Sequence, residues 1–229
     1  MKMANKRIDK LKLFLDISNA KLLVRSIVFI DDTLSKLKLE PNQTLQIQVK
    51  NQFEPIAHTL VLKSVLKSSV IENPNNTQFH KEFVCDDLTI EYDAFPPKLQ
   101  IKHKTQKDEN QIVKIAKDII DFASVEKSVS KIGINYEMFL EEDRNIKDYL
   151  LKDSVAKGFT SLSATPVFEI DGNTTLNLTI ASAINNDGKK GIYFQANFDN
   201  KVTDENTLSV ILDKKFRKMA DEKINLIFG

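Results

Sequence analysis

The sequence predicts an α+β protein made mostly of antiparallel sheets, each covered by a long amphipathic helix. Three observations lead to this prediction. Apolar and polar residues alternate in several segments, as on strands with one buried face. Short turn sequences separate some of these segments. Two other segments carry apolar residues at spacings of three and four, as on one face of a helix.

The predicted strands follow from the period-two alternation. Strand-like runs open the chain at 11–17, 22–30 and 59–71, and the alternation is clearest at 45–49, 88–93, 132–140, 176–180 and 192–198. Two segments between strands hold the residues that tight hairpin turns prefer, Asp171-Gly172-Asn173 and Asn185-Asn186-Asp187-Gly188. We therefore expect a three-stranded antiparallel meander from about residue 166 to residue 199.

Two long helices and one short helix are expected. The first long helix spans about 108–124, and the second spans about 204–223, with Thr203 as its N-cap. A shorter helix is expected at 146–151. In the second helix the apolar stripe consists of Leu208, Ile211, Leu212, Phe216, Met219 and Ala220.

The order of these elements predicts two α+β units. Residues 1–127 would hold strands followed by the first long helix, and residues 128–229 would hold a strand, the meander and the second long helix. The serine-rich stretch 124–130 is the expected boundary.

Composition narrows the class of protein. The chain has 229 residues, of which 41% are hydrophobic and 28% charged, and its formal net charge is +1. This balance excludes a wholly disordered chain. The single cysteine excludes an intrachain disulfide framework and a cysteine-cluster metal site. No signal peptide or apolar run of about 20 residues is visible, so we expect a cytoplasmic protein that does not enter a membrane.

Sequence motifs for catalysis and cofactor binding are missing. The six glycines are scattered singly, and neither a dinucleotide-binding nor a P-loop pattern occurs. A GxSxG nucleophile motif and a HExxH zinc motif are also missing. We therefore assign no catalytic or metal-binding residue and expect no cofactor, and the balance leans away from an enzyme.

Basic residues offer the main candidate binding site. Three lysines share one face of the strand at 98–104, and three more basic residues lie on the last helix. The six residues that could contact phosphates are Lys98, Lys102, Lys104, Lys214, Arg217 and Lys218. Acidic residues balance them, because residues 1–105 carry a charge of +4 and residues 106–229 a charge of −3.

A cluster of carboxylates offers another candidate. Glu141, Glu142 and Asp143 follow the strand that ends at Leu140, and such a cluster can hold Mg²⁺. It can equally be a solvated turn.

Two segments resemble an uncharacterised family of bacterial proteins with a sporadic distribution. One is Val129–Tyr136, and the other is Gly191–Asp199 together with the final helix that contains Phe216 and Ile224. The order Asn135-Tyr136 is the reverse of the family's Tyr-Asn pair, and the arginine expected beside it is missing. The resemblance implies fold and bacterial origin but no activity.

Three functions remain open. The leading one is a non-enzymatic protein-interaction or assembly component of a cytoplasmic bacterial or phage-related system, with a protein partner or self-association. The alternative is a nucleic-acid-associated protein that uses strand 98–104 and the C-terminal helix. The third is a metal-dependent enzyme with a carboxylate site near residues 141–143.

Overall fold

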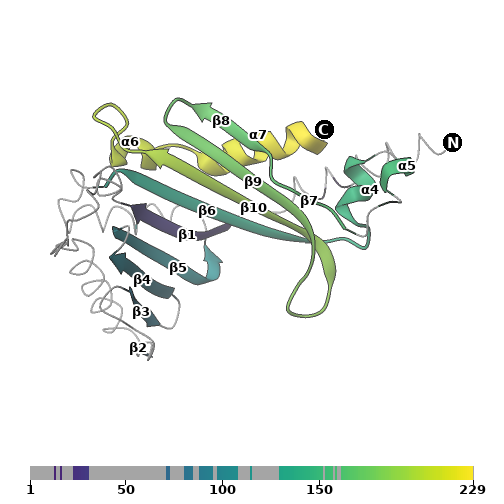
Figure 1. Ribbon diagram of the computed structural model, residues 1–229, viewed down its shortest axis with the longest axis horizontal. Coiled ribbons are helices and arrows are strands. Elements are labelled where there is room, and N and C mark those ends of the chain that lie inside the picture. Colours follow the sequence, from purple (N-terminus) through teal and green to yellow (C-terminus); the bar gives the residue numbers. More distant parts are fainter. Residues whose placement is uncertain are drawn as a thin grey trace, which may run out of the picture. The chain divides into compact units, whose positions relative to one another are not determined.

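The computed structural model is mostly antiparallel β-sheet with a few helices, as the sequence predicts (Figure 1). It describes residues 13, 16, 23–30, 71–72, 80–84, 88–94, 97–107, 114, 129–151, 153–156, 158 and 161–228. The strand expected at 45–49, most of the run at 59–71 and all of the first long helix except Lys114 lie outside these residues. Leu13 and Asp16 are helical, so the strand predicted at 11–17 is wrong at these two positions.

The chain divides into two compact units, each assembled from separate stretches of sequence. Unit 1 comprises residues 1–23, 135–198 and 215–229, and unit 2 comprises residues 24–134 and 199–214. Both units therefore draw on sequence from both sides of residue 127. Two long strands, β6 (Lys131–Glu141) and β10 (Lys190–Lys201), contribute residues to both units.

Unit 2 is an antiparallel sheet. Its strands are β1 (Leu23–Ile30), β2 (Ile71–Glu72), β3 (His80–Val84), β4 (Leu88–Ala94) and β5 (Pro97–Lys107). They hydrogen-bond in the order β2-β3-β4-β5-β1, and the start of β6 follows β1. The register places four apolar side chains in one row, Phe83, Ile90, Ile101 and Ile27, all of them buried. That row forms the inner face of this sheet, as the alternation predicts.

Unit 1 contains the predicted meander. In hydrogen-bonding order, β6 and β10 are followed by β9 (Thr174–Ile184). The short strands β7 (Ser163–Ala164) and β8 (Val167–Asp171) pair with different parts of β9. Gly188 has a positive φ of 79° in the turn between β9 and β10, a conformation in which glycine lacks the steric penalty of other residues. The sequence-based expectation for residues 166–199 is thus confirmed.

The predicted helix at 204–223 is two helices. They are α6 (Leu208–Leu212) and α7 (Phe216–Phe228), and Asp213 caps the end of α6. The N-cap of α6 is Thr207, whose side chain accepts a hydrogen bond from the Val210 N–H, and Thr203 instead accepts one from the Asn206 N–H. The apolar spacing continues through the break, so the sequence pattern reads as one helix where the backbone forms two.

The core of unit 1 is aromatic. Phe198 on β10 contacts the ring of Tyr136 on β6, with ring centroids 6.0 Å apart, and the ring of Phe216 on α7 at 4.8 Å. At the other end of α7, Phe228 contacts Phe194 edge to face. Helix α7 therefore packs on this sheet through the side chains it buries. Within the described part of the chain, no helix is long and apolar enough to cross a bilayer.

Candidate functional site

A hollow of about 360 Å³ lies at the turn end of the unit 1 sheet. It is bounded by the loop that follows β6 (Glu142–Asn145), by the end of β9 (Ser182–Ile184) and by the start of β10 (Lys190 and Gly191). We call it the hairpin-end hollow. Its volume falls within the range of ligand pockets, about 300–1,000 Å³.

Hydrogen bonds from backbone N–H groups to side-chain oxygens hold the loop side of the hollow. The loop leads into α4 (Ile146–Leu150), which confirms the short helix expected at 146–151. Asn145 caps this helix, because its side chain accepts a hydrogen bond from the Lys147 N–H while its own N–H donates to Asp148. The side-chain carboxylate of Glu142 accepts a hydrogen bond of 3.0 Å from the Arg144 N–H. These contacts hold the loop in one conformation beside the sheet.

Ser182 ties the helix to the sheet. The Ile146 N–H donates a hydrogen bond of 2.9 Å to the Ser182 hydroxyl oxygen. Because that oxygen acts as an acceptor here, the hydroxyl hydrogen is left to donate to another group. Ile146 itself is fully buried, which anchors α4 at this point.

Glycine and an aromatic ring shape the strand side of the hollow. A side chain at Gly191 would collide with the Leu140 carbonyl oxygen and with the Phe139 ring. This position therefore requires glycine for close approach of the backbone, although its φ is ordinary. Only a residue without a side chain lets the ring and the strand pack this closely.

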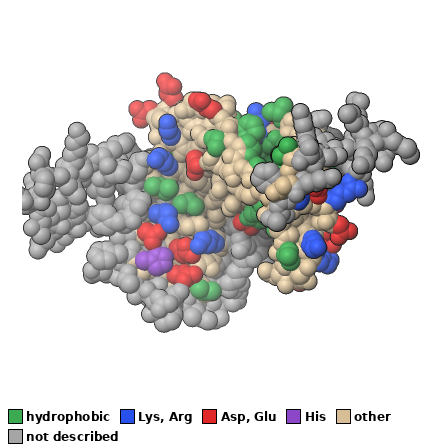
Figure 2. All heavy atoms as spheres, turned by 45° about the vertical axis from the view of Figure 1, so that its right-hand side comes forward, with side chains coloured by type: hydrophobic (Ala, Val, Ile, Leu, Met, Phe, Trp, Pro, Cys, Tyr) green, Lys and Arg blue, Asp and Glu red, His purple; other side chains and the backbone are tan. Residues whose placement is uncertain are grey.

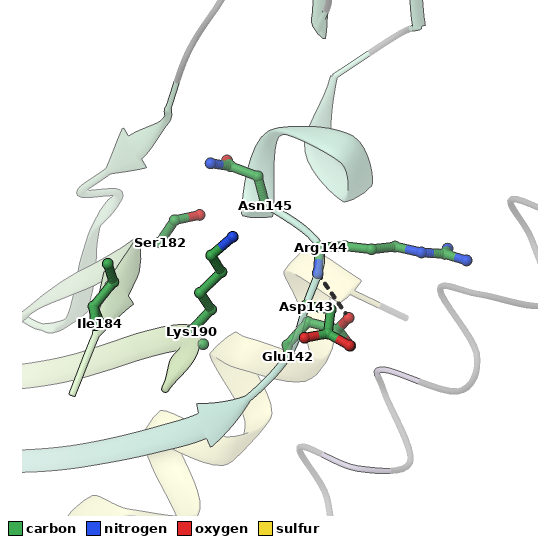
Figure 3. A pocket seen from close by; sticks show the side chains of 9 residues that line it. Glu142, Asp143, Arg144, Asn145, Ser182, Ile184 and Lys190 are labelled. Atoms are coloured by element: carbon green, nitrogen blue, oxygen red, sulfur yellow. Dashed lines mark hydrogen bonds between the residues drawn. The ribbon is translucent and has the colours of Figure 1, made fainter. Parts of the chain in front are cut away.

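The charged side chains around the hollow point in two directions. Figure 3 shows Lys190, Ser182, Ile184 and Asn145 gathered on one side of the loop backbone. The side chains of Glu142, Asp143 and Arg144 extend on the other side. The Lys190 ammonium group has no carboxylate partner among the described residues, whereas its neighbour Lys189 forms an ion pair with Glu141 at 2.6 Å. Within the described part of the chain, the Lys190 ammonium group is thus available at the hollow to an anion from outside.

Ile184 adds an apolar contact surface. Its side chain is 67% exposed at the end of β9, although the even-numbered residues from Leu176 to Ile180 on the same strand are buried. Ile184 and Lys190 therefore place an apolar and a cationic side chain on the same side of the hollow.

Of the three carboxylates singled out from the sequence, Glu142 and Asp143 line this hollow and Glu141 does not. Glu141 is in the ion pair with Lys189, Glu142 bonds to the loop backbone, and Asp143 is exposed. Across the described ranges, no group of three or more histidine, cysteine, aspartate or glutamate side chains is placed to hold a metal ion.

The predicted nucleic-acid-binding residues fall in both units. Lys98, Lys102, Lys104 and Lys214 belong to unit 2, and Arg217 and Lys218 belong to unit 1. Lys98 and Lys102 form ion pairs with Asp93 and Glu91 at 2.7 and 2.6 Å. Arg217 and Lys218 lie 3.8 and 3.9 Å from Asp221 and Glu222 along α7. Lys104 lies within β5, but its side chain is outside the described set.

Lys98 and Lys102 belong to a charged face on unit 2. The face comprises His80, Glu82, Glu91, Asp93, Lys98 and Lys102, and Figure 2 shows acidic and basic side chains interleaved around a histidine. Asp93 lies at its centre, with its two carboxylate oxygens 2.5 Å from Nδ1 of His80 and 2.7 Å from Nζ of Lys98. Partial burial acts to raise the pKa of Asp93, but hydrogen bonds from Lys98 and His80 outweigh it, and the pKa lies below its ordinary value.

Sequence reasoning reached only the loop side of the hairpin-end hollow. It singled out Glu142 and Asp143 but missed Ser182, Ile184 and Lys190, which come from strands about 40 residues further along the chain. One signal was present: Ile184 continues the apolar alternation of β9 up to the turn, where a strand side chain leaves the core.

No protein-family model matches the chain, and neither a curated protein nor a solved structure matches it.

Proposed function

We propose that this protein is a non-enzymatic protein-interaction or assembly component of a cytoplasmic bacterial or phage-related system, and that it docks its partner at the hairpin-end hollow. The observation that supports this proposal is the pairing of Lys190 and Ile184. One is a cation without a carboxylate partner among the described residues, and the other is an exposed apolar side chain. Both line the same hollow.

The hollow is preformed, which favours docking of a partner. Its loop is held by the Asn145 cap and the Ile146–Ser182 hydrogen bond, so little conformational entropy is lost when a partner docks. No histidine is among the described residues that line the hollow, so Ser182 lacks there the imidazole base that most often activates a hydroxyl nucleophile. The arrangement supports recognition of a partner side chain.

The alternative of nucleic-acid binding draws less support from the contacts. Phosphate binding requires cations that are available to replace counterions. Lys98 and Lys102 are both engaged with carboxylates, so each would have to exchange a carboxylate for a phosphate.

Site-specific photo-crosslinking in cells tests the docking proposal. A photoreactive amino acid at position 184 should yield a discrete cross-linked protein, either another chain or a second copy of this one. The same amino acid at Val167, which is 62% exposed on β8 of the same unit, serves as the matched control. We expect the adduct at position 184 to disappear with Lys190→Glu. Equal adducts at positions 184 and 167, or an adduct that Lys190→Glu leaves unchanged, would refute docking at the hollow.

A further inference from the structure

We infer that the hairpin-end hollow recognises a carboxylate next to an aliphatic side chain, in an extended acidic segment of a partner protein. This inference rests on the proposed docking function and specifies what the hollow binds. It is carried by charge complementarity, by the hydroxyl group of Ser182 and by the position of Ile184.

The positive charge of the hollow comes from Lys190. Lys189, its neighbour along the chain, is already paired with Glu141 at 2.6 Å, and the side chain of Arg144 points away from the hollow (Figure 3). An isolated ammonium group at the mouth of a pocket attracts an anion and can form charge-assisted hydrogen bonds with it. A carboxylate is the anionic group that protein side chains supply.

Ser182 supplies a second donor. Its oxygen accepts the 2.9 Å hydrogen bond from the Ile146 N–H, so its hydroxyl hydrogen remains to be donated. A carboxylate accepts through both of its oxygens, so one group can satisfy the ammonium and the hydroxyl together. A ligand with an ammonium group in that position would be repelled by Lys190.

The rim of the hollow selects against polyanions. Glu142 and Asp143 border the hollow, with carboxylates directed away from Lys190 (Figure 3). A nucleic acid brings many phosphates and would place some of them near these two carboxylates, which repel them. A short peptide that alternates acidic and aliphatic residues can present one carboxylate to Lys190, turn the uncharged neighbour toward the rim and leave its other carboxylate in solvent. The local charges therefore favour a peptide over a nucleic acid.

Ile184 accounts for the aliphatic part of the ligand. Its side chain is 67% exposed beside Lys190, so an aliphatic side chain of the partner could cover it while the carboxylate reaches the ammonium. Burial of both surfaces removes apolar area from water and adds to the affinity. The segment expected is one in which aspartate or glutamate alternates with leucine, isoleucine or valine.

The test is a titration of the full chain with two synthetic peptides, followed by backbone amide NMR spectra. The first peptide is acetyl-Asp-Leu-Asp-Ile-amide, and the second is its isostere acetyl-Asn-Leu-Asn-Ile-amide. We expect the acidic peptide to shift the amide signals of Ile184, Lys190 and Gly191, and to bind at least tenfold more tightly than the isostere. Equal affinity for the two peptides, or shifts confined to other parts of the chain, would overturn the inference.

Variants distinguish Lys190 from the other basic residues nearby. Lys190→Gln should lower affinity for the acidic peptide to that of the isostere, and Ser182→Ala should lower it by a smaller factor. Lys189→Gln is the matched control and should leave affinity within about twofold, because Lys189 does not line the hollow and is paired with Glu141. An equal loss with Lys189→Gln would mean that general positive charge, not the hollow, binds the peptide.

The same titration separates this inference from the docking proposal. A cross-link at position 184 that depends on Lys190, combined with equal binding of both peptides, would preserve docking and refute carboxylate recognition. Competition by a short oligothymidine that outmatches the acidic peptide would refute the inference in favour of nucleic acid.

Discussion

The charged face of unit 2 and the hairpin-end hollow of unit 1 both carry lysines on strands, but their lysines differ in availability. On the charged face, Lys98 and Lys102 are engaged with carboxylates of the neighbouring strand β4. At the hollow, Lys189 is paired with Glu141, and Lys190 has no such partner among the described residues. Lysines that look alike in the sequence therefore differ in whether the fold pairs them with a carboxylate.

The two regions should also differ in what stabilises them. Unit 1 is held by an aromatic core, and the charged face of unit 2 is held partly by ion pairs. Substitutions that remove packing should therefore cost more than substitutions that remove charge. The losses in unfolding free energy should therefore decrease from core substitutions to surface-charge substitutions.

Phe198→Ala should have the largest effect on stability. Phe198 is fully buried and contacts the rings of both Tyr136 and Phe216, so its removal leaves a cavity between the sheet and α7. We expect a loss of about 4 kcal/mol in the free energy of unfolding. Urea denaturation followed by circular dichroism measures this loss. A loss below about 1 kcal/mol would contradict an aromatic core as the main support of unit 1.

Gly191→Ala should rank second. The added methyl group would overlap the Leu140 carbonyl oxygen and the Phe139 ring, and the backbone oxygen cannot move without disturbing the ladder between β6 and β10. We expect a loss of about 2 kcal/mol. Gly172→Ala is the matched control, because a Cβ at that position meets no atom within 4 Å. If both substitutions cost the same in urea denaturation, the close approach at Gly191 is not what constrains this position.

Asp93→Asn should cost about 1 kcal/mol at neutral pH, because it removes a carboxylate held by Lys98 and His80. The folded-state pKa of Asp93 lies below its ordinary value, so its contribution is present above the unfolded pKa of about 4 and is lost as the pH falls through the folded value. The difference in unfolding free energy between wild type and variant should therefore shrink toward zero in acid. Thermal unfolding at a series of pH values measures it, and a difference that grows as the pH falls would contradict the assignment.

The strands of the fold could be predicted from sequence better than the break between its last two helices. Alternation identified β9 and β10 because each of these strands has one buried face, and the Asp171-Gly172-Asn173 turn placed β8 before them. The pattern of Leu208, Ile211, Leu212 and Phe216 fits a continuous helix, and the chain breaks at Asp213–Lys215 without a glycine or proline to mark the place. Local periodicity records which side chains are buried and does not record where the backbone turns.

The candidate site could be predicted only in part, for a different physical reason. Glu142 and Asp143 were predicted from the sequence as part of a carboxylate cluster, but their carboxylates point away from the hollow (Figure 3). Ser182 and Lys190 looked like ordinary strand residues, and their importance depends on which loop lies beside them. Whether a charge has a partner is a property of tertiary structure, as the ion pairs of Lys98 and Lys102 also demonstrate.

The smallest expected effect on stability is that of substitutions at Lys189 and Lys190, which test directly whether the pairing of a lysine decides its role. Lys189 and Lys190 are adjacent, alike in chemistry and both exposed, yet only Lys189 has a carboxylate partner among the described residues. Both members of the Lys189–Glu141 pair are more than half exposed, so Lys189→Gln should cost only about 0.3 kcal/mol, and less in high salt.

Lys190→Gln should leave stability unchanged while it removes binding of the acidic peptide, and Lys189→Gln should do the reverse. Urea denaturation measures the unfolding free energy of the two variants, and peptide titration measures their affinity for the acidic peptide. Equal losses of affinity in both variants would show that Lys189 and Lys190 contribute equally to peptide binding, and would contradict a special role for Lys190. A loss of affinity only with Lys190→Gln, and of stability only with Lys189→Gln, would assign the difference between the two lysines to their partners, since they are adjacent and have the same side chain.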